Sequence, residues 1–321
     1  MQLLVYLPLL IPALAAVAAR PLAARLEPRE ATWLLTAATV VLAGCSTAAL
    51  ALLVASAAAQ VPVLAALGHY SPPVLRRGDP TSAVTGAVAA LVLTGAALAV
   101  AITFRCRARG LAESYRRAAR LHGDGAVVVV PGPAIEAYAL PGSPGRIVVS
   151  GRLLESLDDA GRAALLAHER AHLAGRHHLF TTVAYLAAAA NPVLLPLARA
   201  VDYTVERWAD EHAASVTGDR RLVAATIGQV AMLATPRHRP AAATLGIVAA
   251  NSRRASTRSR RISVAWAGPV PRRVAALLAP PPRTRALLLA LAVLVVLVAG
   301  VSALQAARDL HALLELADPT H

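Results

Sequence analysis

Four long apolar segments constrain most strongly what this chain can fold into. They run roughly over residues 3–19, 31–59, 83–104 and 286–304. A helix needs about 20 mainly apolar residues to cross the hydrocarbon core of a bilayer. Only 16% of the residues are charged, whereas soluble domains carry about 25%. The sequence therefore predicts a mainly α membrane protein with four transmembrane helices. The first is expected to be retained, because no basic region precedes it.

The arginines indicate how these helices are oriented. The net charge is +14, and Arg-rich stretches occupy residues 20–29, 105–120 and 253–285. All three stretches fall on one side of the membrane if the N-terminus is outside. Loops on the cytoplasmic side carry an excess of Arg, so the pattern predicts a multi-pass protein of the cell membrane with residues 105–285 in the cytoplasm. Because the arginines flank apolar runs, we assign the basic excess to membrane topology and expect no direct nucleic-acid partner.

The region between the third and fourth apolar segments has the pattern of a compact α+β unit. Two β-branched runs bounded by Gly and Pro, 126–130 and 146–150, predict strands. A helix is expected to start near 156–159 and to continue to about 177. A second helix is expected over 197–216, because Gly218 is suited to the C-terminal cap.

The first of these predicted helices carries the run His168-Glu169-Arg170-Ala171-His172. Histidines four residues apart project from the same helix face, so both imidazoles can reach one zinc ion. The Glu that follows the first His can then act as general base toward a zinc-activated water. The alternative is an amphipathic helix with surface His and Glu, which would not explain why these residues interrupt an Ala- and Leu-rich run.

A catalytic zinc site needs a third protein ligand, which is expected from another helix. Glu206 is the best candidate, and Asp210, one turn further on, is placed to accept the second ring N–H of a zinc-bound His. His212 is a possible stabiliser of the oxyanion of the tetrahedral intermediate, with a plain surface role as the alternative. His177 and His178 are interpreted as a solvated helix end rather than as ligands.

The segment 179–200 is apolar enough to resemble another span, but Asn191 and Pro192 interrupt it. A single crossing would put Glu206 on the side of the membrane opposite His168. Two crossings would need about 40 residues. If the metal assignment holds, this segment is buried protein core or dips into the membrane and returns.

Several of these residues together resemble the membrane gluzincin metallopeptidases. The similarity rests on 139–150, 166–172, Asn191-Pro192 and the Glu206–Asp210 run. Two branches are similar: the BlaR/MecR-type antirepressor peptidases, and the HtpX-like and CAAX-protease-type group. The resemblance implies a zincin-like α+β domain with zinc on His168, His172 and Glu206 and with Glu169 catalytic. It also implies that the strand at 146–150 is the edge to which an extended substrate adds.

The sequence thus predicts an integral-membrane zinc endopeptidase that cleaves cytosolic or membrane proteins, with a transcriptional repressor as one candidate substrate. The alternatives are HtpX-like quality control of membrane proteins and a non-catalytic zinc-binding signal transducer. A transporter would need ionisable residues within the spans, and the four segments contain none. The expected organisation is a three-helix transmembrane region (1–104), a zinc metallopeptidase domain (105–234), a basic Arg/Pro-rich linker (235–285), a last transmembrane helix (286–304) and a short tail (305–321).

Overall fold

The computed structural model describes residues 6–61, 83–121, 125–132, 134–234, 269–281 and 286–317. The chain forms two compact units. Unit 1 comprises residues 1–104, 180–201 and 284–321, and unit 2 comprises residues 105–179 and 202–283.

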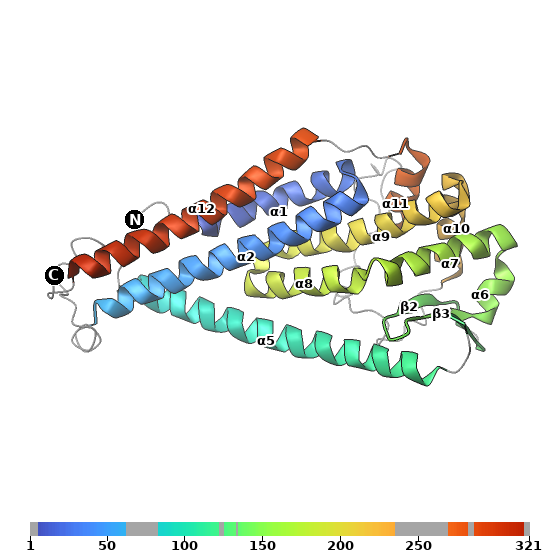
Figure 1. Ribbon diagram of the computed structural model, residues 1–321, viewed down its shortest axis with the longest axis horizontal. Coiled ribbons are helices and arrows are strands. Elements are labelled where there is room, and N and C mark those ends of the chain that lie inside the picture. The colour runs from blue at the N-terminus through green and yellow to red at the C-terminus, as the bar shows by residue number, and fades with distance from the viewer. Residues whose placement is uncertain are drawn as a thin grey trace, which may run out of the picture. The chain divides into compact units, whose positions relative to one another are not determined.

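Unit 1 is built on long apolar helices. Helices α1 (Leu7–Arg25), α2 (Pro28–Ala59) and α12 (Ala286–Ala317) pack against one another, and α5 (Ala83–Arg120) contributes its first part (Figure 1). Four helices in the described residues are long and apolar enough to cross a membrane: Leu7–Arg25, Pro28–Ala59, Ala83–Arg120 and Ala286–Asp309. This agrees with the four spans predicted from the sequence.

The predicted break at Asn191 is present in unit 1. Helix α8 (His177–Ala190) ends there, a short 3-10 turn η1 (Pro192–Leu194) follows, and α9 (Leu195–Thr217) begins. The Asn191 side chain accepts a hydrogen bond from the Val193 N–H at 3.1 Å and donates one to Ser46 Oγ at 3.0 Å. Pro192 has no N–H to continue the preceding helix. The side chain of Asn191 therefore caps the turn and holds it against α2.

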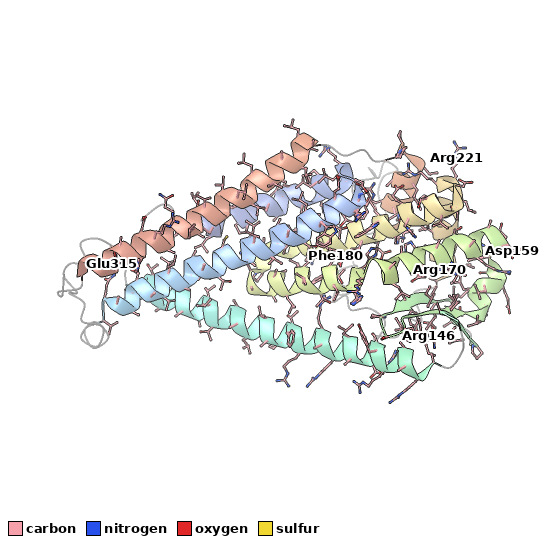
Figure 2. All side chains as sticks on the ribbon, viewed as in Figure 1. Arg146, Asp159, Arg170, Phe180, Arg221 and Glu315 are labelled. Atoms are coloured by element: carbon pink, nitrogen blue, oxygen red, sulfur yellow. The ribbon has the colours of Figure 1, made fainter. Side chains whose placement is uncertain are left out.

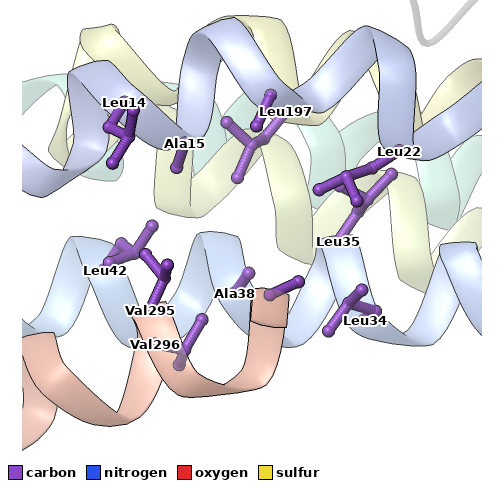
Figure 3. Close-up of a pocket in the computed structure, with 12 residues that line it drawn as sticks. Leu14, Ala15, Leu22, Leu34, Leu35, Ala38, Leu42, Leu197, Val295 and Val296 are labelled. Atoms are coloured by element: carbon purple, nitrogen blue, oxygen red, sulfur yellow. The ribbon is translucent and has the colours of Figure 1, made fainter. Parts of the chain in front are cut away.

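A small apolar pocket of about 70 Å³ lies in unit 1 (Figure 3). Its walls come from α1, α2, α12 and the start of α9, with Leu14, Leu42, Leu197 and Val295 among the side chains that line it. All of the lining residues are Leu, Val or Ala. The pocket therefore offers no side chain that could transfer a proton or hold an ion.

Unit 2 contains a three-stranded sheet of strands β1 (Val127–Val130), β2 (Ala137–Leu140) and β3 (Arg146–Ser150), in the order β1-β3-β2. Strand β3 runs parallel to β1, with Val128 opposite Val148, and antiparallel to β2, with Tyr138 opposite Val148. The expectation that residues 146–150 form an edge strand is therefore wrong. Strand β3 is instead the central strand of the sheet. Its three consecutive apolar residues Ile147, Val148 and Val149 are at most 2% exposed, as expected of a strand that is covered on both faces.

Helix α7 (Asp159–Ala174) follows the sheet after the short helix α6 (Gly151–Ser156). Asp158 starts α7 because its carboxylate accepts the Gly161 N–H at 2.8 Å, which satisfies one of the free donors of the first turn. Asp159 at the beginning of α7 and Arg170 near its end are both exposed (Figure 2). Another face of α7 packs against β2 and β3, where Leu165 is buried with Ile147 and Val149. Glu169 of α7 is also buried.

The predicted second helix corresponds to α9, which ends before Gly218. Gly218 has a φ of 71°, a left-handed conformation that glycine adopts without strain at a helix C-terminus. Asp219 then caps α10 (Arg220–Leu233) by accepting the N–H groups of Arg221 at 2.8 Å and Leu222 at 3.1 Å. Gly218 thus ends α9, and Asp219 begins α10.

The structure differs from the expected linker at 269–278, where the chain forms helix α11 (Pro269–Leu278). This helix packs on α10, and Leu277, 3% exposed, is buried in a cluster with Ala213, Val223 and Ala224. Arg220 donates to the carbonyl oxygens of Ala276 and Ala279 at 3.0 and 2.9 Å, which satisfies acceptors at the end of α11. The rest of the expected linker, 235–268 and 282–285, lies outside the described residues.

If α11 is part of the folded unit, two adjacent leucines should respond differently to truncation. Leu277→Ala should lower the free energy of unfolding by roughly 2–5 kcal/mol, because it leaves a cavity in the cluster. Leu278→Ala should change it by less than about 0.5 kcal/mol, because Leu278 is 60% exposed. Urea unfolding of the detergent-solubilised protein measures both values. Equal, small effects would mean that α11 does not contribute to the core.

Candidate metal centre

Helix α7 brings the two motif histidines together. Their side chains are 12% and 19% exposed, and Nε2 of His168 lies 3.1 Å from Nε2 of His172. The two rings meet edge to face with their centroids 4.8 Å apart. This arrangement follows from their spacing of four residues, which places both side chains on one face of the helix.

Helix α9 adds the carboxylate of Glu206. Its Oε2 lies 3.8 Å from His168 Nε2, and its Oε1 lies 3.6 Å from His172 Nε2. Among the described residues, His168, His172 and Glu206 form a group whose ligand atoms all lie within 4.8 Å of one another. Atoms bound at about 2.1 Å around a tetrahedral zinc ion are about 3.4 Å apart. The donor atoms and their separations therefore fit a single zinc ion.

Asp210, one turn after Glu206 on α9, lies behind His168. Its Oδ1 is 3.0 Å from His168 Nδ1, although the direction is bent away from that of a linear hydrogen bond. Burial lowers the pKa of His168, but the neighbouring carboxylates, Asp210 first and Glu206 and Glu169 after it, together outweigh this effect, and the net pKa is raised. Asp210 thus favours a proton on Nδ1, which leaves Nε2 free to face Glu206 and His172.

Arg273 of α11 pairs with both carboxylates of α9, and sequence reasoning missed it. Its Nε and Nη2 donate to the two oxygens of Asp210 at 2.8 and 2.6 Å, and its Nη1 lies 2.7 Å from Glu206 Oε2. Arg273 is 11% exposed and Asp210 is 2% exposed. Burial raises the pKa of Asp210, but the bonds from Arg273 and His168 bring it below its usual range. Both groups therefore remain charged.

Glu169, the residue after His168, is buried, with 8% of its surface exposed. Burial raises the pKa of its carboxyl, and the negative charge of Glu206 adds to this effect. His168, Arg273 and a hydrogen bond from the Ala139 N–H of β2 act in the opposite direction without reversing the shift. A carboxylate with a raised pKa is a stronger base, so Glu169 has the property expected of a general base.

His177 contradicts the interpretation as a solvated helix end. It is 3% exposed, its Nδ1 lies 2.9 Å from Nδ1 of His172, and its ring lies 4.7 Å from that of Trp208. Burial, with a smaller contribution from His172, lowers the pKa of His177 to about 3, so the ring is neutral. The helix was expected to run through His177, but it ends at Ala174 and the chain turns at Arg176, with a φ of 48°.

The structure does not bring His212 to this group. His212 is exposed on α9, two positions after Asp210. With about 100° of rotation per helical residue, it points about 200° away from Asp210 around the helix axis. Its neighbour Glu211 pairs instead with Arg220 at 2.7 Å.

A His-Glu-x-x-His helix joined by a glutamate from a second helix is the arrangement of a metallopeptidase. Residues 105–281 match the model of Peptidase family M48, and this match covers more than half of the chain. The chain therefore belongs to Peptidase family M48, which confirms the resemblance to membrane gluzincin peptidases. The matched region extends through α11 and so includes Arg273. Searches of curated proteins and of solved structures found no match.

The pairing of Arg273 predicts a large loss of stability when its charge is removed. Arg273→Met should destabilise the metal-free protein by roughly 3–5 kcal/mol, because two carboxylates are left without their cation. Arg272→Met is the matched control, since its guanidinium lies 4.1 Å from the centre of the Tyr203 ring, and it should cost about 0.5–1 kcal/mol. Urea unfolding in detergent measures both, and equal losses would contradict the assigned role of Arg273.

Proposed function

We propose that this protein is a multi-pass membrane endopeptidase with one zinc ion, held by His168, His172 and Glu206. The observation that carries the proposal is the convergence of two imidazole nitrogens and a carboxylate at separations of 3.1 to 3.8 Å. Glu169 and Asp210 have the catalytic and orienting roles. The Arg-rich segments support a cytoplasmic position for the peptidase unit, with the N-terminus outside.

When bound, zinc would supply a Lewis acid that lowers the pKa of a water molecule to about 7 and polarises the scissile carbonyl. Glu169 takes the proton from the attacking water and delivers it to the leaving amine, a role that its raised pKa supports. Asp210 keeps His168 in the tautomer that presents Nε2. Arg273 holds Asp210 and Glu206 in place.

Strand β2 is the proposed place for an extended substrate. Among the described strands it is an edge strand of the sheet, since it pairs with β3 on one side only, and it packs against α7. The Ala139 N–H donates to Glu169, so the backbone of β2 reaches the proposed base directly. A peptide that adds to this strand by main-chain hydrogen bonds would pass next to the metal ligands.

A cytoplasmic site defines the class of substrate as cytosolic proteins or the cytoplasmic segments of membrane proteins. A transcriptional repressor is the substrate that the similarity to antirepressor peptidases suggests. Cleavage of damaged membrane proteins is the corresponding expectation from the HtpX-like branch. The two are distinguished by which proteins are cut.

Glu169→Gln should retain zinc but lose roughly 10²–10⁴-fold in peptide-bond cleavage, because the amide cannot accept the proton. The matched control is Glu155→Gln on α6, an exposed position, which should retain both. The measurements are the zinc content of purified protein and mass spectrometry of new peptide termini in membranes that carry each variant. Cleavage by Glu169→Gln at the rate of the wild type would refute the proposed mechanism.

A further inference from the structure

The two proposed histidine ligands are supported by different partners. Nδ1 of His168 faces the carboxylate of Asp210 at 3.0 Å, whereas Nδ1 of His172 faces Nδ1 of His177 at 2.9 Å. In both rings, Nε2 is the nitrogen that faces the carboxylate of Glu206. His168 is thus supported by an anion and His172 by an imidazole.

The position of His177 is closely defined by its surroundings. Its ring is buried, with a centroid 4.7 Å from that of Trp208 of α9. A Cβ at Gly175 would collide with Nε2 of His177, so only a glycine there leaves room for the ring. The left-handed turn at Arg176 starts α8 at His177 and brings this side chain back beside His172.

The nitrogen of His177 that contacts His172 is Nδ1, and it lies next to Nδ1 of His172. The Nδ1 and Nε2 of one imidazole point in different directions, so Nδ1 of His172 points away from an ion bound at its own Nε2. His177 therefore cannot bind the same ion through the nitrogen that contacts His172. A close pair of imidazole nitrogens instead requires one N–H donor and one lone-pair acceptor. If Nε2 of His172 binds the metal, its Nδ1 carries the proton, so His177 must be the acceptor.

We propose that His177 is a positioning residue for the metal site: its Nδ1 accepts the Nδ1–H of His172 and thereby directs Nε2 of His172 toward the ion. This inference rests on the proposed function, because it assumes the same zinc ligands. Partners of this kind fix the ring orientation and tautomer of a metal-bound His, and carboxylates, carbonyls or waters usually supply them. Here a neutral histidine takes that place.

Three variants test the role. His177→Leu removes the acceptor, whereas His177→Asn retains it, because Oδ1 of Asn occupies about the position of Nδ1 of His. His178→Asn is the matched control at the next residue, which is half-buried. Zinc affinity is measured on the detergent-solubilised full chain by competition with a fluorescent chelator.

We expect zinc to bind roughly 10–100-fold more weakly to His177→Leu than to the wild type. His177→Asn should remain within about threefold of the wild type, and His178→Asn should be unchanged, since both variants keep an acceptor beside Nδ1 of His172. Undiminished affinity in His177→Leu, or an equal loss in the Leu and Asn variants, would overturn the inference. If the wild type itself bound no zinc, the proposed function would fail instead.

A spectroscopic signature separates positioning from a general loss of structure. In the Co²⁺-loaded protein, the Nδ1–H proton of His172 should give a paramagnetically shifted NMR line. The line should exchange slowly with solvent in the wild type and in His177→Asn, because the proton is held in a hydrogen bond. In His177→Leu it should exchange rapidly. Slow exchange in the Leu variant would show that His177 is not the acceptor.

Discussion

The buried carboxylate of Asp210 joins three helices of the peptidase unit. From α9 it faces Nδ1 of His168 on α7 at 3.0 Å and accepts two hydrogen bonds from Arg273 on α11. A buried charge is costly unless it is paired and hydrogen-bonded, so this position constrains both partners. The orientation of the first metal-ligand candidate and the docking of α11 thus depend on the same side chain.

The charges around this carboxylate explain why the site suits a divalent cation. Glu206 and Asp210 share the single positive charge of Arg273, and Glu169 adds a third carboxyl group. The carboxyl groups therefore outnumber the one arginine, and a divalent cation would offset the excess of negative charge. Burial makes such a balance important, because charges interact more strongly away from water.

Local patterns in the sequence were sufficient to predict which residues of helices α7 and α9 lie together in the candidate site. The spacing of His168 and His172 is a property of any α-helix, and the four apolar segments are readable from length and composition. Glu206 was found because a catalytic zinc site needs a third ligand from another helix. Strand β2 was missed, since Ala137-Tyr138-Ala139-Leu140 contains no β-branched residue.

Arg273 and His177 were missed for different physical reasons. Arg273 is 63 residues from Asp210 in the sequence, and a basic segment gives no local signal of which arginine becomes buried. A left-handed turn at Arg176 places His177 beside His172. This conformation is uncommon for a residue other than glycine, so the sequence does not predict it. Both residues act through tertiary contacts, which residue spacing cannot reveal.

Zinc K-edge X-ray absorption of the purified, zinc-loaded protein would measure whether two imidazoles and one carboxylate of this chain hold a single zinc ion. We expect four light ligands at about 2.0–2.2 Å, with the outer-shell scattering of two imidazoles and no sulfur. A sulfur shell at about 2.3 Å, or scattering from a third imidazole, would contradict the assigned ligands.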